Sequence, residues 1–227
     1  MKHYIQSTIF RKVLSAITGL FLVSFLLCHL AGNLQLFITG VDGQTQFNKY
    51  ALFMTTNPVV NMLSIITYLS IILHIIVTLY LTVLSRKARP IGYAVNNNSA
   101  SSKWSSRNMS VLGVVILLFL IVHLRSFWYE MHFGNIPYQY LEDGTKLKDL
   151  HKITVSAFQN PLYTAFYILC MVALSFHLMH GVESATQTIG LKVPSYERAI
   201  KYAGKFLALT MPTIFASIPI YLYLTRS

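Results

Sequence analysis

Five hydrophobic stretches, each near or above the ~20 residues that a helix needs to cross a bilayer, take up most of this chain. Lipid offers no hydrogen-bond partner to the backbone, so segments of this length cross it as helices. We place the helices at about 11–37, 58–84, 108–129, 161–188 and 206–224. The sequence therefore predicts an all-α integral membrane bundle of five transmembrane helices, with residues 1–227 forming a single domain.

Composition agrees with a membrane protein: 54% of the residues are hydrophobic and 11% are charged, against about 25% charged in an average soluble domain. A net charge of +11 could indicate nucleic-acid binding. However, the basic residues lie between the hydrophobic stretches and not on one soluble face, so we expect a lipid bilayer and no nucleic acid.

The distribution of charge also predicts the orientation. Of the 18 lysines and arginines, twelve fall in connections on the side of the N-terminus and six on the other side. The positive-inside rule then puts the N-terminus in the cytoplasm and the C-terminus outside. We further expect a short helix over 47–56 at the membrane surface, an exposed Asn- and Ser-rich loop between Pro90 and Arg107, and a long connection over about 130–160 that carries most of the acidic residues. A basic amphipathic segment is expected over 195–205, and a bend at Pro212 and Pro219.

Four of the hydrophobic stretches each contain a histidine, namely His29, His74, His123 and His177. Lipid provides no partner for an imidazole, so these side chains must face the bundle interior. At 1.5 Å per residue, His29 lies about 24 Å and His123 about 18 Å from the cytoplasmic start of its helix. His74 and His177 each lie about 22 Å from the outside. Depth thus pairs His29 with His123 toward the outer face, and His74 with His177 toward the cytoplasmic face.

Two histidines that face each other at one depth are what bis-axial ligation of a b-type haem requires. Two such levels predict two haems and a route for electrons across the membrane. Gly181, four residues after His177, would leave room for a macrocycle. His180 competes with His177 as a ligand, but it lies nearer the helix end and suits an interfacial position near haem propionates. A single intramembrane histidine is often only a hydrogen-bonding residue between helices.

On these residues the chain resembles a known family, the di-haem cytochrome b membrane anchor of succinate dehydrogenases and fumarate reductases, in its single-chain, five-helix form. The matching motifs are Ser15-x-x-Thr18-Gly19 with His29 eleven residues after the threonine, and His177-x-x-x-Gly181. The resemblance covers nearly the whole chain, and it implies that His29, His74, His123 and His177 are the axial ligands in the same two pairs.

The resemblance also implies partners and a place of action. A flavoprotein and an iron-sulfur subunit would dock on the cytoplasmic face of a bacterial cytoplasmic membrane, and the two haems would relay electrons to menaquinone or another quinone. Succinate chemistry would take place on another subunit. Depth suggests Ser15, Trp104, Arg107 and Lys192 as donors to the propionates of the haem near the cytoplasmic face.

A quinone site needs an apolar slot, a donor for each carbonyl and a source of protons. Candidates near the outer haem are Asn33, Gln35, Tyr50, Arg125 and Glu130.

Three other readings of the chain stay open at this point. The same anchor would serve a quinol:fumarate reductase that runs in the opposite direction. A cytochrome b subunit of a hydrogenase or formate dehydrogenase also binds two haems, with a different distribution of ligands among the helices. A protein of another class, a transporter or scaffold without haem, would use its histidines to bridge helices or to shuttle protons.

Overall fold

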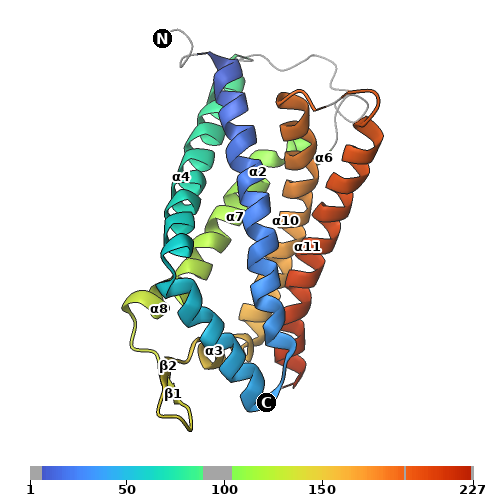
Figure 1. The fold of residues 1–227 in the computed structure, drawn as a ribbon. Coiled ribbons are helices and arrows are strands. Elements are labelled where there is room, and N and C mark those ends of the chain that lie inside the picture. Colours follow the sequence, from blue (N-terminus) through green and yellow to red (C-terminus); the bar gives the residue numbers. More distant parts are fainter. Residues whose placement is uncertain (1–6, 89–103, 192, 226–227) are drawn as a thin grey trace.

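In the computed structural model, which describes residues 7–88, 104–191 and 193–225, the chain forms an elongated bundle of long helices (Figure 1). Five helical spans among these residues are long and apolar enough to cross a membrane: Thr8–Phe37, Pro58–Lys87, Met109–Phe133, Pro161–Thr188 and Glu197–Thr225. The predicted all-α membrane bundle is therefore confirmed. We call the end of the bundle at which the first span begins the upper end, as in Figure 1, and the opposite end the lower end.

The order of elements follows the chain closely. α2 (Thr8–Asn33) continues into a 3₁₀ turn, η1 (Leu34–Phe37), and α3 (Gly40–Thr56) then leads to α4 (Pro58–Lys87). After the short α6 (Trp104–Arg107), α7 (Met109–His123) continues through a π-helical turn, η2 (Leu124–Trp128), into α8 (Tyr129–Phe133). β1 (Tyr138–Tyr140), β2 (Lys146–Lys148) and α9 (Leu150–Phe158) precede the last two long helices, α10 (Pro161–Thr188) and α11 (Glu197–Thr225).

Helix boundaries follow local chemistry. Asn57 and Asn160 each accept two backbone N–H groups at the start of α4 and α10, and each is followed by a proline in the first turn. This combination is favourable because the proline lacks an N–H that would otherwise have no partner. At the end of α10, Gly190 adopts a positive φ of 79°, a backbone conformation that favours glycine and ends the helix.

Three details differ from the sequence-based expectation. α11 begins at Glu197, so the basic segment over 195–205 largely belongs to the last long helix. The surface helix expected over 47–56 begins earlier, at Gly40. The connection expected over 130–160 contains the end of the α7–η2–α8 span, a two-stranded antiparallel hairpin in which Gln139 pairs with Leu147, and α9. The exposed loop expected between Pro90 and Arg107 lies largely outside the described residues.

Within the bundle, α10 is the central helix and packs against α2, α7 and α11, while α4 packs against α2. Pro212 lies inside α11, where it cannot donate a hydrogen bond to the carbonyl of Ala208 four residues earlier. The Ser175 hydroxyl of α10 donates to that carbonyl at 2.7 Å. The proline is thus accommodated by a polar contact between helices inside an otherwise apolar core.

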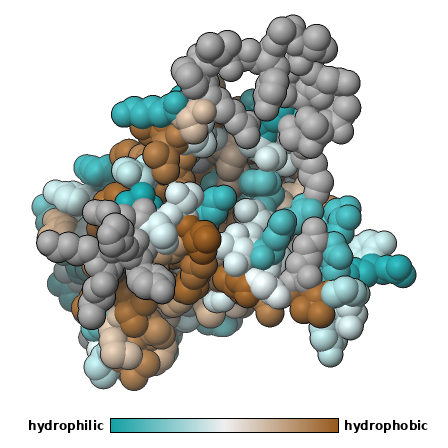
Figure 2. Space-filling view, turned by 90° about the horizontal axis from the view of Figure 1, so that it is seen from above, coloured by the Kyte–Doolittle hydropathy of each residue, from teal (hydrophilic) through white to brown (hydrophobic). Residues whose placement is uncertain are grey.

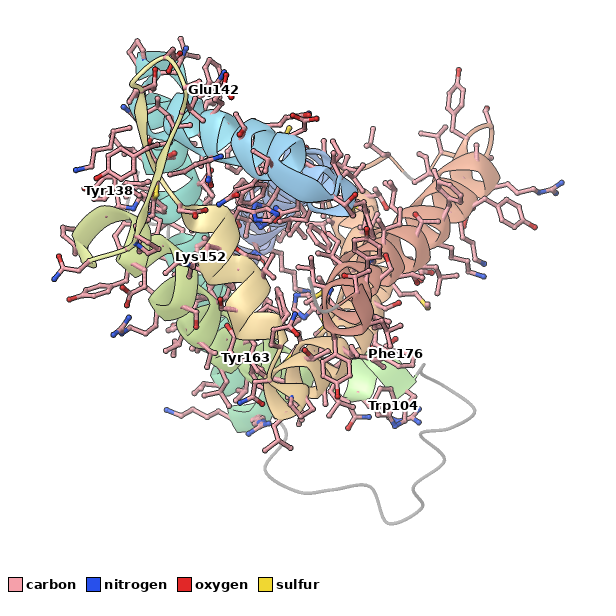
Figure 3. The ribbon with its side chains drawn as sticks, turned by 90° about the horizontal axis from the view of Figure 1, so that it is seen from below. Trp104, Tyr138, Glu142, Lys152, Tyr163 and Phe176 are labelled. Atoms are coloured by element: carbon pink, nitrogen blue, oxygen red, sulfur yellow. The ribbon has the colours of Figure 1, made fainter. Side chains whose placement is uncertain are left out.

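A layer of short elements covers the lower end. We call α3, β1, β2 and α9 the lower layer; these elements lie at the foot of the long helices in Figure 1. Seen from below in Figure 3, Glu142 lies at the tip of the hairpin, which extends away from the centre of the bundle. Asn48 of α3, 1% exposed, joins the layer together: its Nδ2 donates to Gln139 and to Asp149, and its Oδ1 accepts from the N–H of His151.

The upper end carries exposed basic side chains, whereas the sides of the bundle are apolar. At the upper end the exposed basic residues Arg86 and Lys87 close α4, and Arg198, Lys201 and Lys205 lie in the first turns of α11. Figure 2 looks onto this end and shows hydrophilic side chains interspersed with hydrophobic ones. On the sides of the bundle, large apolar side chains such as Ile65, Leu69 and Ile72 of α4 are more than half exposed, as expected for helices that face lipid.

Candidate functional site

The four intramembrane histidines meet inside the bundle in two pairs. The ring centroids of His29 in α2 and His123 in α7 lie 5.8 Å apart, with an interplanar angle of 88°. The centroids of His74 in α4 and His177 in α10 lie 6.5 Å apart, with an angle of 67°. These are the pairs that depth along the helices predicts. We call His74 and His177 the upper pair, and His29 and His123 the lower pair.

The upper pair lines a large cavity. Its volume is about 870 Å³, within the range of ~300–1,000 Å³ that is usual for small-molecule and cofactor sites, and its lining is mainly apolar. Residues from α2, α4, α7 and α10 form its walls. The cavity reaches from Ile9 and Lys12, near the upper end of α2, down to Phe25 and Phe119.

Glycines open the backbone of several helices onto this cavity. A Cβ added to Gly113 of α7 would meet no atom within 4 Å, and one added to Gly181 of α10 would meet only Met109 Cε at 3.9 Å. Gly19 of α2 lies closer to the imidazole, because its added Cβ would lie 3.1 Å from His74 Cε1. The missing side chains create space for a flat, bulky group beside the two histidines.

Hydrogen bonds in the upper pair are unequal. His74 Nδ1 lies 3.2 Å from the hydroxyl of Thr18. His177 Nδ1 is buried and has no hydrogen-bond partner among the described residues. A buried imidazole nitrogen without a partner is costly in an apolar environment, so this histidine suits a site that binds a further group.

Aromatic rings surround the lower pair. Phe25 stacks on His29 with centroids 5.4 Å apart, Phe119 stacks on His123 at 5.5 Å, and Phe215 lies 5.8 Å from His29. Neither histidine of this pair lines the large cavity, whose lower limit is formed by two of these phenylalanines. A planar group between His29 and His123 therefore needs these rings to turn aside, whereas the upper pair has space beside it as it stands.

Tyrosines provide the polar contact of the lower pair. His123 Nδ1 lies 3.3 Å from the hydroxyl of Tyr167, which is 6% exposed. The Tyr167 hydroxyl lies 2.8 Å from that of Tyr163, one turn earlier in α10. Neither tyrosine is predicted from the sequence, because depth along a helix does not give the direction in which a side chain points.

The predicted surroundings of the upper pair are brought together in part. Ser15, His180 and Gly181 line the cavity. Trp104 does not, because its ring packs against Phe176 at a centroid distance of 5.3 Å (Figure 3). Arg107 is exposed at the end of the same short helix and is absent from the cavity lining. Lys192 lies outside the described residues.

The five quinone candidates lie on five elements, α2, η1, α3, η2 and α8, and differ in their contacts. Asn33 Nδ2 donates to the His29 carbonyl at 2.7 Å and lies 3.5 Å from His29 Nε2. Gln35 Oε1 is buried without a partner among the described residues, and the Tyr50 hydroxyl lies directly against Gly32. Burial raises the pKa of Tyr50 above its ordinary value, followed by a smaller effect of Cys28.

The other two quinone candidates interact with each other. Arg125 and Glu130 form an ion pair, and the Arg125 guanidinium lies 4.5 Å from the ring centroid of Tyr129. The ion pair engages one nitrogen of Arg125 and one carboxylate oxygen of Glu130, and a guanidinium has five N–H donors in all. Within the described ranges, no group of three or more His, Cys, Asp or Glu side chains lies close enough together to hold a metal ion without a cofactor.

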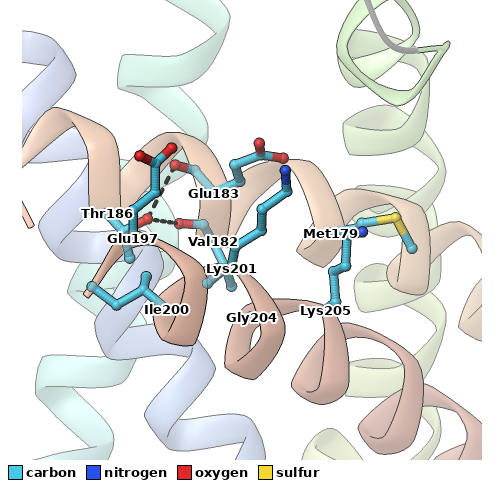
Figure 4. Close-up of a pocket in the computed structure, with 9 residues that line it drawn as sticks. All are labelled: Met179, Val182, Glu183, Thr186, Glu197, Ile200, Lys201, Gly204 and Lys205. Atoms are coloured by element: carbon cyan, nitrogen blue, oxygen red, sulfur yellow. Dashed lines mark hydrogen bonds between the residues drawn. The ribbon is translucent and has the colours of Figure 1, made fainter. Parts of the chain in front are cut away.

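A smaller hollow lies between α10 and α11 near the upper end. Its volume of about 30 Å³ gives room for one or two water molecules. Figure 4 shows the side chains of Glu183 and Lys201 pointing toward each other across it. We assign it no part in binding a larger group.

Comparisons of the chain with protein-family models, with curated proteins and with solved structures found no match. The geometry of the two histidine pairs therefore stands as the evidence on function.

Proposed function

We propose that this chain is a membrane-embedded di-haem cytochrome b that anchors a succinate:quinone oxidoreductase and relays electrons to menaquinone or another quinone. The observation that supports it most is the upper pair: two histidines from different helices, 6.5 Å apart between ring centroids, beside an apolar cavity of about 870 Å³. The lower pair provides the same ligands at a second depth, so that two b haems would lie along the bundle.

Each part of the upper site has a role in this proposal. His74 and His177 would hold the haem iron through one ring nitrogen each. Gly113 and Gly181 would keep side chains away from the macrocycle, Gly19 would give room to the His74 imidazole, and the apolar walls would exclude water. Ser15, His180 and Lys12 line the cavity as polar groups for propionates. A bound haem supplies one-electron chemistry, while the helices fix the distance between the two levels.

The assignment to succinate dehydrogenase rests on the Ser15-x-x-Thr18-Gly19 and His177-x-x-x-Gly181 motifs. In the proposed orientation the upper end faces the cytoplasm of a bacterial cell, and its exposed lysines and arginines would receive the flavoprotein and iron-sulfur subunits. The quinone would be reduced near the lower pair, where the Tyr50 hydroxyl could donate to a quinone carbonyl and the buried Gln35 Oε1 could accept from a hydroxyl of the quinol. A fumarate reductase is the same proposal with electrons moving in the opposite direction.

The first test is a reduced-minus-oxidised absorbance spectrum of the purified protein, together with the number of haems per chain. The expected result is b-type bands and two haems. If the protein is prepared with a sufficient supply of haem and shows no b-type bands, the result would contradict the proposal. It would favour a transporter or scaffold without haem. Co-purification with a flavin-containing subunit and an iron-sulfur subunit would separate succinate dehydrogenase from the hydrogenase and formate dehydrogenase readings.

Variants of the ligands test the pairing. His74→Ala and His177→Ala should remove the same haem, while His29→Ala and His123→Ala should remove the other. His180→Ala tests the competing ligand, because its imidazole lies three residues from that of His177 on the same helix and also lines the cavity. Both haems should remain bound in this variant, since His180 is assigned to a propionate and not to the iron. Loss of one and the same haem in His29→Ala and His74→Ala would refute the pairing.

A further inference from the structure

Each histidine pair contains one imidazole whose Nδ1 lies against a hydroxyl from another helix. Thr18 of α2 contacts His74 of α4 at 3.2 Å, and Tyr167 of α10 contacts His123 of α7 at 3.3 Å. We infer that Thr18 and Tyr167 are positioning residues, which fix the tautomer of one iron ligand in each pair and separately lower the reduction potential of the haem at that level. This inference rests on the proposed function.

The hydrogen bonds of Thr18 favour one tautomer of His74. The Thr18 hydroxyl has one proton, and it donates to the Leu14 carbonyl at 2.8 Å, with the Ser15 carbonyl at 3.1 Å. It therefore accepts a hydrogen bond from His74, so the proton of the neutral ring is on Nδ1. This leaves the lone pair of Nε2 free to bind iron. Thr18 is 6% exposed, so water does not compete for its hydroxyl.

Tyr167 provides the equivalent acceptor at the lower level. With His123 Nδ1–H donating to Tyr167, the Tyr167 hydroxyl can donate in turn to Tyr163, 2.8 Å away, and both donors are then satisfied. The ring of Tyr167 is held by edge contacts with Phe119 at 5.0 Å and Phe158 at 4.9 Å. The hydroxyl is thus fixed by packing as well as by hydrogen bonds.

An acceptor on Nδ1–H makes the imidazole more basic and a stronger donor to iron. Stronger donation stabilises oxidised iron more than reduced iron, so it lowers the reduction potential. Removing the acceptor should raise the potential of the haem at the same level and leave the other haem unchanged. Two hydroxyls on different helices would thus allow the two potentials to be set independently.

The experiment is a redox titration of the purified protein, with each haem assigned through the ligand variants. Thr18→Val should shift the reduction equilibrium of the haem bound by the upper pair about tenfold toward the reduced form, which is ~59 mV for a one-electron couple. Tyr167→Phe should shift the haem of the lower pair by a similar factor. Thr18→Ser, which keeps the hydroxyl, should titrate like the unchanged protein.

Matched controls come from neighbouring hydroxyls. Thr78 lines the same cavity, but its hydroxyl donates to the backbone carbonyl of His74 at 2.6 Å and not to the imidazole. Thr78→Val should therefore leave the reduction potential of the upper haem unchanged. Tyr163→Phe keeps the Tyr167 hydroxyl beside His123 and should shift the lower haem less than Tyr167→Phe does.

The outcomes separate this inference from the proposed function. Two bound haems whose potentials do not move in Thr18→Val and Tyr167→Phe would overturn the inference alone, as would an equal shift of both haems in either variant. Loss of the upper haem in Thr18→Val, with retention in Thr18→Ser and Thr78→Val, would support it. If the purified protein binds no haem, the proposed function itself is contradicted. Nitrogen NMR of the haem-free protein gives a second measurement: His74 protonated on Nδ1 is expected, and protonation on Nε2 would overturn the inference.

Discussion

Asp149 ties the lower layer together, and its replacement by alanine should destabilise that layer strongly. The side chain is 3% exposed and accepts three hydrogen bonds: from Gln44 Nε2 at 2.7 Å, from Asn48 Nδ2 at 2.9 Å and from the backbone N–H of Lys152 at 3.0 Å. The last of these caps the N-terminus of α9. At the other end of α9, Phe158 packs against Tyr167, so this carboxylate helps to position the residues around the lower pair.

The magnitude follows from these contacts. Loss of the cap costs about 1 kcal/mol, and each of the two other hydrogen bonds to the carboxylate costs about 1.5 kcal/mol. Asp149→Ala should therefore lose about 4 kcal/mol, or roughly 8–16 °C in melting temperature for a chain of this size. Asp149→Asn keeps an acceptor for the cap and should lose less.

Thermal unfolding in detergent, followed by far-UV circular dichroism, measures the loss. Amide hydrogen exchange in α9 should increase more than exchange in α10, because the perturbation begins in the lower layer. Asp143→Ala is the surface control: Asp143 accepts a backbone hydrogen bond from Thr145 within the hairpin turn and is fully exposed, so its loss should be small. A melting temperature of Asp149→Ala within about 2 °C of the unchanged protein would refute this reasoning.

Three further predictions concern the cavity, the helix packing and pH. Gly181→Leu should prevent haem binding by the upper pair while the lower haem stays, because the added side chain enters the cavity; haem content measures this. Gly204→Val should cost roughly 1–3 kcal/mol of stability, since its Cβ would lie 3.0 Å from Val182 Cγ1; calorimetry tests it. Burial lowers the pKa of His151 below 6.5, and the Asp149 carboxylate partly opposes this shift. The folded state then binds fewer protons than the unfolded state, so acidification through pH 6.5 should destabilise the lower layer, and NMR titration should show a still lower pKa in Asp149→Asn.

The arrangement of histidines could be predicted from the sequence because it depends on quantities that a sequence contains. Helix length and rise fix depth, and the direction of each helix alternates with its order in the chain. His29 and His123 therefore fall at one level, and His74 and His177 at another, without any knowledge of side-chain contacts. The fold class follows from the same hydrophobic lengths.

The partners of these histidines could not be predicted, because they depend on the rotation of one helix relative to its neighbour. Thr18 was visible as part of a motif, but only the packing of α2 against α4 brings its hydroxyl to His74. Trp104 shows the opposite case: its depth suggested a place beside the upper pair, yet its ring packs on Phe176. The hairpin and α9 of the lower layer could not be predicted from hydrophobic periodicity, because their order comes from buried side-chain hydrogen bonds such as those of Asn48.

The π-helical turn after His123 lets one span satisfy two different neighbours. It adds a residue to the turn Leu124–Trp128, and each residue rotates an α-helix by about 100°. His123 faces the bundle interior, while Trp128 donates its indole N–H to Tyr68 of α4 at 2.8 Å. Deletion of one residue within 124–128 would therefore turn this segment into an ordinary α-helical turn and leave both His123 and Trp128 facing their neighbours. A deletion between Leu112 and His123 has no extra residue to absorb it and would turn the imidazole out of the bundle. Along this span, the tolerance of the chain to insertions and deletions should change abruptly at a single histidine.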